Sequence, residues 1–243
     1  MRVRFLGTGD AFSSGGRLHT CILLEGAGAP CLLDCGATAL AALKGAGVDR
    51  HAITTVLVTH LHGDHFGGLP FLLLDGQFTG RSLPLTIAGP PGLETRLAAA
   101  YDAFYPGVSR TRRPFDTRFT ILTAGMTSSI GELRVTPFAV VHPSGAPAYA
   151  LRVEIDGRVI VFSGDTAWTD ALVEASAGAD LFICECMFET NAVGAHIDYA
   201  TLDAERHRFT CRRLVLTHLG PQMLARATDL AVETAYDGLE IAL

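Results

Sequence analysis

Four potential metal ligands stand close together in the first third of the chain: His60, His62, Asp64 and His65, in the pattern H-x-H-x-D-H. They directly follow an apolar run, 53–58, that is typical of a buried strand. Imidazole and carboxylate groups this dense at a strand end would be costly to bury without partners, and together they suit zinc, manganese or iron. Because the last two lie on the turn into the next helix, they need not point where the first two point. The spacing therefore predicts two metals.

Three more candidate ligands stand where later strands are predicted to end: His142, Asp165 and His218. The seven candidates divide into two groups bridged by Asp165: His60, His62 and His142 on one metal, and Asp64, His65 and His218 on the other. Water or hydroxide held between two such metals is acidic enough to attack an ester near neutral pH. Because the metal pair is positively charged, we expect it to favour an anionic ester, such as a phosphodiester, over neutral substrates.

Glu185 ends the apolar run 180–186, and a carboxylate buried there needs a hydrogen-bonding partner. His196, in the loop that follows, is the candidate partner. Asp34 ends another apolar strand, and two interpretations remain open. It is either a turn-capping carboxylate or a group that orients a metal-bound histidine. His207 falls on the polar face of a predicted helix, so we expect it at the surface.

Composition narrows the range of partners. The net charge of −6 argues against a general nucleic-acid surface, because such binding depends on Lys and Arg neutralising phosphates. The basic stretch that contains Arg110, Arg112 and Arg113 is either a solvated face or a loop that clamps a substrate phosphate. No apolar run approaches the ~18 residues that span a bilayer, and the N-terminus does not resemble an export signal. We therefore expect a cytoplasmic protein without a membrane contact, with its six cysteines reduced.

The elements that must position these groups alternate between strands and helices. Strands are predicted at 2–6, 20–25, 31–34, 54–58, 83–88, 119–122, 132–142, 149–155, 159–163, 180–186, 213–216 and 239–243. Helices are predicted at 37–43, 71–75, 91–105, 170–177, 199–209 and 221–227. Two of the strands end in Thr-His-Leu, at 59–61 and 217–219, which suggests two similar halves that face one site.

The whole pattern resembles the metallo-β-lactamase superfamily, and within it the ribonuclease Z and phosphodiesterase branch. The resemblance rests on Leu6-Gly7-Thr8-Gly9, the H-x-H-x-D-H cluster, His142, Ser163-Gly164-Asp165-Thr166 and the closing His218. It implies an α/β (α+β) fold, a four-layer αββα sandwich, in one domain over residues 1–243. It also supports the division into two metal groups, with two divalent ions, zinc first and manganese or iron as alternatives. A homodimer is implied by analogy with the family alone.

One further match concerns catalysis. Ribonuclease Z-like enzymes carry a glutamate after the bridging aspartate and, further on, a histidine that assists the leaving oxygen. Cys184-Glu185-Cys186-Met187-Phe188 resembles the first motif with its flanking residues changed, and His196 stands where the second is expected. Glu185 would keep His196 protonated, so that it could protonate a departing alkoxide. An ordinary buried Glu–His pair is the alternative. We expect Glu185, His196 and Asp64 to act in catalysis.

The chain departs from true ribonuclease Z enzymes in one respect. Those enzymes insert a long tRNA-gripping arm between the ligands that His142 and Asp165 match, and here only 23 positions separate the two. We therefore expect a hydrolase that acts on a small or cyclic phosphodiester, a small anionic ester, through metal-bound hydroxide. The alternatives are hydrolysis of a thioester, lactone or lactam, a ribonuclease Z-like RNA endonuclease, and a metal-binding or sensory module whose site has decayed.

Overall fold

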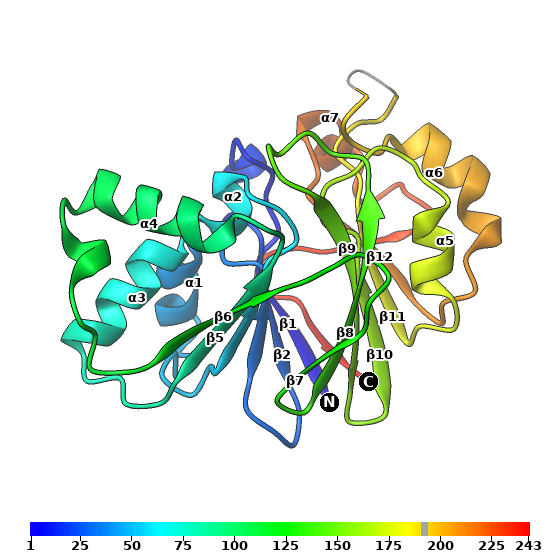
Figure 1. Cartoon of the computed structure of the whole chain (residues 1–243). Coiled ribbons are helices and arrows are strands. Elements are labelled where there is room, and N and C mark those ends of the chain that lie inside the picture. Colours follow the sequence, from blue (N-terminus) through cyan, green and yellow to red (C-terminus); the bar gives the residue numbers. More distant parts are fainter. Residues whose placement is uncertain (191–193) are drawn as a thin grey trace.

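Two mixed sheets of seven strands face each other, and helices cover the outer face of each (Figure 1). This computed structural model describes residues 1–190 and 194–243. Helices α1, α3 and α4 lie outside the first sheet, and α5 and α6 lie outside the second. The layers are therefore those of the predicted αββα sandwich.

The first sheet is built mainly from the N-terminal half and closed by the last strand of the chain. Its order is β14 (Glu240–Ala242), β1 (Arg2–Gly7), β2 (Cys21–Glu25), β3 (Cys31–Leu33), β4 (Thr55–Leu57), β5 (Leu85–Gly89) and β6 (Thr117–Ile121). Strands β14 to β3 pair antiparallel, and β3 to β6 pair parallel. Its helices are α1 (Ala39–Gly45), α2 (Gly63–Phe66), α3 (Leu69–Phe78) and α4 (Leu93–Phe104).

The second sheet has the same mixture of pairings. Its order is β13 (Glu233–Thr234), β12 (Leu214–Thr217), β11 (Leu181–Glu185), β10 (Arg158–Phe162), β9 (Ala148–Ile155), β8 (Leu133–Val140) and β7 (Ser128–Ile130). Strands β7 to β10 pair antiparallel, and β10 to β13 pair parallel. Its helices are α5 (Ala171–Ser176), α6 (Tyr199–Glu205) and α7 (Pro221–Ala225). Short 3-10 turns η1 (Ser14–Gly16), η2 (Val108–Arg110) and η3 (Arg206–Arg208) complete the elements.

Apolar side chains fill the space between all four layers. On β2, Ile22 and Leu24 point into the cluster between the two sheets, and Cys21 and Leu23 point into the cluster beneath α1, α3 and α4. A third cluster packs the second sheet against α5, α6 and α7. Because both faces of each sheet are covered, its central strands are apolar at almost every position instead of alternating.

The structure refines several expected boundaries. The segment predicted as one helix at 199–209 is α6 followed by η3, with His207 exposed as expected. Asp156 and Gly157 form the two-residue turn between β9 and β10, both with φ above zero, as a type I′ hairpin turn requires. All six cysteines are free, and only Cys211 is not fully buried. Within the described ranges, no helix is long and apolar enough to cross a membrane.

Candidate metal centre

The seven predicted ligands all lie at one end of the molecule, where strands of both sheets finish. Thr59 connects β4 to His60 and His62, and α2 carries Asp64 and His65. The other three, His142, Asp165 and His218, closely follow β8, β10 and β12. Because the carboxyl ends of parallel strands meet at one sheet edge, the two sheets together bring all seven to one place.

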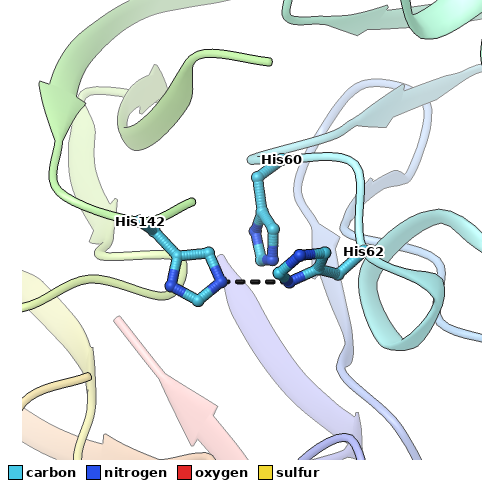
Figure 2. Close-up of side chains that lie close together, drawn as sticks. All are labelled: His60, His62 and His142. Carbon is cyan, nitrogen blue, oxygen red and sulfur yellow. Dashed lines mark hydrogen bonds between the residues drawn. The ribbon is translucent and has the colours of Figure 1, made fainter. Parts of the chain in front are cut away.

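His60, His62 and His142 form the first group, with one nitrogen from each lying within 4.8 Å of the others. Figure 2 shows their rings turned toward a common centre from two separate segments of the chain. His62 Nδ1 lies 3.0 Å from His142 Nε2, the contact drawn as a dashed line. His60 is fully buried, His62 is half-buried as a residue, and only 3% of the His142 side chain is exposed.

Asp64, His65, Asp165 and His218 form the second group, and all four are buried. His65 Nε2 lies 3.3 Å from Asp64 Oδ2 and 3.2 Å from Asp165 Oδ1. His218 Nε2 lies 3.2 Å from Asp64 Oδ2 and 3.4 Å from Asp165 Oδ2. Asp165 Oδ2 is also 3.8 Å from His60 Nε2 and 3.9 Å from His142 Nε2 in the first group. The geometry thus matches the predicted division, with Asp165 between the two groups.

The donor atoms at the centre fit a cation. His60 Nε2, His65 Nε2 and Asp165 Oδ1 are buried and have no hydrogen-bond partner among residues 1–190 and 194–243. A buried polar atom left in this state costs free energy, and such atoms in native proteins normally have a partner, water or an ion. Divalent ions bound by imidazole and carboxylate would satisfy all three, so the residues present fit the metals that their types predicted.

The charge around the second group favours a positive ion. Burial alone would lower the pKa of His65, but Asp165, Asp64 and Asp34 outweigh it and raise that pKa well above its usual value. In the same way Asp165 and Asp64 outweigh burial and raise the pKa of His218 to about 9. Burial and the neighbouring His65 lower the pKa of His60. The carboxylates therefore stabilise positive charge at the depth where the second group lies.

Asp34 holds histidines of both groups in place. Its Oδ1 accepts a hydrogen bond from Thr59 N at 2.8 Å, and its Oδ2 accepts bonds from Thr59 Oγ1 at 2.8 Å and His65 Nδ1 at 2.6 Å. His60 Nδ1 in turn donates to Thr59 Oγ1 at 3.0 Å. With the proton on Nδ1, each ring keeps its Nε2 lone pair for the centre. Of the two interpretations of Asp34, the structure supports the one in which it orients a histidine of the centre.

Glu185 and His196 form the expected pair beside the centre. His196 Nδ1 donates to Glu185 Oε1 at 2.9 Å. The buried carboxylate also accepts hydrogen bonds from Thr166 N at 2.7 Å and Met187 N at 3.3 Å. Burial would lower the pKa of His196, but the hydrogen bond to Glu185 and the negative charges of Glu185 and Asp165 together outweigh burial and raise that pKa. The His196 ring centre lies 4.9 Å from that of His142, so the pair borders the site.

Two contributors are not evident from the sequence. The carbonyl of Ala195 accepts a hydrogen bond from His142 Nδ1 at 2.8 Å, so the lone pair of this ring lies on Nε2, the atom that contacts His62 Nδ1. A backbone group such as this carbonyl leaves no signal in residue type. The Thr59 hydroxyl links Asp34 to His60. The repeated Thr-His-Leu at 59–61 and 217–219 is the sequence feature that could have drawn attention to this threonine.

The basic stretch does not join the site. The first turns of α4 lie beside the site, since Arg96 Nη1 is 3.5 Å from the carbonyl of Leu61. The arginines of the basic stretch follow the opposite, C-terminal end of α4. Arg110 and Arg112 are exposed, and the Arg113 guanidinium lies over the Tyr101 ring at 5.3 Å. A helix of this length rises about 18 Å, which favours the solvated-face interpretation.

Comparison with known proteins agrees with this geometry. A family model described as anti-Pycsar protein Apyc1 matches residues 1–234. The chain belongs to this family. Ribonuclease Z of Anoxybacillus flavithermus is 28% identical, with 97% of this chain and 92% of the relative covered. Ribonuclease Z of Methanothermobacter thermautotrophicus is 27% identical, with 97% and 91% covered.

Solved structures show the same fold. The short form of human tRNase Z superposes with a TM-score of 0.80 at 26% identity, covering 100% of this chain and 99% of that one. The metallo-β-lactamase fold protein YhfI of Bacillus subtilis gives 0.76 at 24%, with 99% and 98% covered. The predicted superfamily branch, the sandwich fold and the enzyme class, a metal-dependent hydrolase, are confirmed.

Proposed function

We propose that the chain is a two-metal phosphodiesterase that acts on small or cyclic phosphodiesters. The arrangement of the site carries the proposal: two groups of metal-binding atoms share Asp165, and a Glu185–His196 pair stands beside them. Hydrolysis of a phosphodiester needs an activated water, neutralisation of charge at phosphorus and a proton for the leaving oxygen. The seven ligands and the pair divide these tasks between them.

The first two tasks fall to the seven ligands. His60, His62 and His142 would hold one divalent ion, Asp64, His65 and His218 would hold the other, and Asp165 would bridge them. Zinc is our first choice. When bound, the ions acidify a water molecule and offset the negative charge that develops at phosphorus. Asp64 has a second task, because its carboxylate reduces the net positive charge of the centre and so helps product to leave.

His196 supplies the third task. Because its Nδ1 proton is donated to Glu185, the proton it can give to substrate is the one on Nε2. Glu185 stabilises the protonated ring, and its other hydrogen bonds keep its carboxylate in place. A departing alkoxide gains most from such a proton, since an alcohol is a poor leaving group as an anion.

Three observations favour a small substrate. The interval between His142 and Asp165 holds the β9–β10 hairpin, and the net charge is −6. The alignment with the Anoxybacillus ribonuclease Z runs over 293 positions, more than the 243 residues of this chain, so that relative carries segments missing here. The relatives named ribonuclease Z support the second candidate, an RNA endonuclease, and the experiment has to include RNA.

His196→Ala tests the proposed proton donor. We expect it to lower kcat on a cyclic nucleoside monophosphate, which has an alkoxide leaving group, by about 10²–10⁴-fold. The loss on bis(p-nitrophenyl) phosphate is expected to be smaller, because p-nitrophenolate departs without a proton. His207→Ala is the matched control, since this exposed histidine lies on η3 with its Nδ1 2.8 Å from the carbonyl of Ala204 and is not one of the proposed ligands.

The outcomes separate the candidate functions. Equal losses on the two phosphodiesters would remove the leaving-group role of His196. Turnover of thioesters or lactones by the metal-loaded protein, without turnover of phosphodiesters, would replace the proposal with the other hydrolase class. Cleavage of a precursor tRNA faster than any small diester would establish the RNA endonuclease instead.

A further inference from the structure

Asp237 joins the two ends of the chain beside the candidate metal centre. Its Oδ1 accepts hydrogen bonds from Thr8 N at 2.9 Å and Thr8 Oγ1 at 2.7 Å, and its Oδ2 accepts one from Leu18 N at 2.7 Å. Hydrogen bonds to an ionised group are roughly twice as strong as neutral ones. A single half-buried carboxylate therefore fixes the backbone at both Thr8 and Leu18.

The turn that carries Asp237 is itself held by both sheets. Ala235 N donates to the carbonyl of Leu216, on β12, at 2.7 Å. Gly238 N donates to the carbonyl of Phe5, on β1, at 2.7 Å. Asp237 thus lies where the chain crosses from β13 in the second sheet to β14 in the first. Its position is defined only once the two sheets have come together.

Thr8 passes this constraint to His218. The Thr8 carbonyl accepts a hydrogen bond from His218 N at 3.0 Å, and the Thr217 hydroxyl approaches it at 3.5 Å. His218 has φ +58, a left-handed conformation that a residue with a side chain keeps only when its surroundings hold it. The bond to Thr8 is the one that holds its backbone N–H. A shift of Thr8 would therefore move the imidazole that faces Asp64 and Asp165.

The glycines on either side of Thr8 permit this arrangement. A Cβ at Gly7 would lie 2.0 Å from the carbonyl oxygen of His19, and one at Gly9 would lie 2.8 Å from that of Arg17. Side chains at these positions would push Thr8 away from the backbone of residues 17–19. Close packing around Thr8 therefore explains the Gly-Thr-Gly segment.

We propose that Asp237 is a positioning residue that sets His218 through the carbonyl of Thr8. The inference rests on the proposed function, because it takes His218 as a ligand of the second ion. It adds that the second ion is held tightly only when the last turn of the chain has locked the two sheets together. Asp237 touches neither metal nor substrate.

Zinc binding to metal-free protein tests the inference without reference to activity. Titration against a competing chromophoric chelator gives the number of ions and the affinity of each. In Asp237→Ala we expect the affinity of one ion to fall about 10–100-fold, the usual effect of losing a group that orients a ligand, and that of the other to stay unchanged. Asp180→Ala is the matched control. Asp180 accepts hydrogen bonds from Val159 N, Arg158 and Arg212 at the far end of β11, and we expect it to leave both affinities unchanged.

A milder variant covers the case in which Asp237→Ala does not fold. Asp237→Asn keeps an oxygen for Thr8 but places an amide N–H₂ against Leu18 N–H, and we expect a smaller fall for the same ion. Wild-type affinities for both ions in these variants would overturn the inference, as would equal falls for both ions. If wild-type protein binds only one ion, both the proposed function and this inference fail. If it binds two ions but hydrolyses no phosphodiester, the proposed function fails alone.

Discussion

Replacing Asp34 with asparagine should weaken metal binding by both groups of ligands without changing the backbone conformation. Asp34 is fully buried and has φ +58, a conformation that asparagine accepts and alanine does not. One oxygen accepts from Thr59 N, so the amide oxygen must stay there. The NH₂ group then replaces the oxygen that accepts from the Thr59 hydroxyl and from His65 Nδ1.

That exchange reverses the proton positions in both rings. His65 Nδ1 must now accept from the amide, so its proton moves to Nε2, where the metal would bind. The Thr59 hydroxyl accepts the other amide hydrogen and donates to His60 Nδ1, which moves the proton of His60 to Nε2 as well. The substitution removes the hydrogen bond from His65 Nδ1 to the charged Asp34 carboxylate, and hydrogen bonds to charged groups contribute about 1.5–3 kcal/mol. At 1.4 kcal/mol per tenfold change, this corresponds to a loss of about 10–100-fold in metal affinity.

Zinc titration of metal-free Asp34→Asn, with circular dichroism to verify folding, measures the effect. We expect both ions to bind more weakly, unlike Asp237→Ala, where only one should. Asp156→Asn is the control, because Asp156 also has a positive φ (52°) and accepts a hydrogen bond from a distant backbone, Ala27 N at 2.7 Å, with no histidine present. Wild-type affinity for both ions in Asp34→Asn would refute the orienting role of the carboxylate.

Three further results are expected. Removing metal with a chelator should lower Tm, and zinc should restore it, because an ion that binds only the folded state stabilises it. Leu151→Ala should lower the free energy of unfolding by about 2–5 kcal/mol in urea titrations, because the side chain is fully buried between the sheets. Burial would raise the pKa of Asp75, but Arg50 and Lys44 outweigh it and hold that pKa below its usual 3.8. Asp75→Asn should therefore cost about 1 kcal/mol near neutral pH, and the difference from wild type should vanish as pH falls through the lowered pKa; a difference that persists in acid would contradict this.

The sequence predicted the centre because its chemistry lies at strand ends. Apolar runs located the strands, and His60, His142, Asp165 and His218 each stood where such a run stopped. Glu185 and His196 were paired correctly because a buried carboxylate must have a partner. Their roles, like the single domain over 1–243 and the homodimer, stay predictions.

What the sequence could not supply are contacts between backbone groups and distant residues. Asp237 and Thr8 lie 229 positions apart, and neither residue type indicates the other. The α-helix and the strands that were missed, α2, β7 and β13, have only four, three and two residues, too few to show a period. The early end of α6 has a similar cause, because its last turn tightens into η3 without a glycine or proline to mark the change.

The most direct test of a two-metal phosphodiesterase is turnover measured while zinc is added to metal-free protein. Hydrolysis of bis(p-nitrophenyl) phosphate would be followed against the number of ions bound per chain. We predict little turnover with one ion and a steep rise as the second binds, since attack of water on the phosphodiester requires an ion in each of the two groups of ligands. Full activity with a single ion, or none with two, would contradict the central claim.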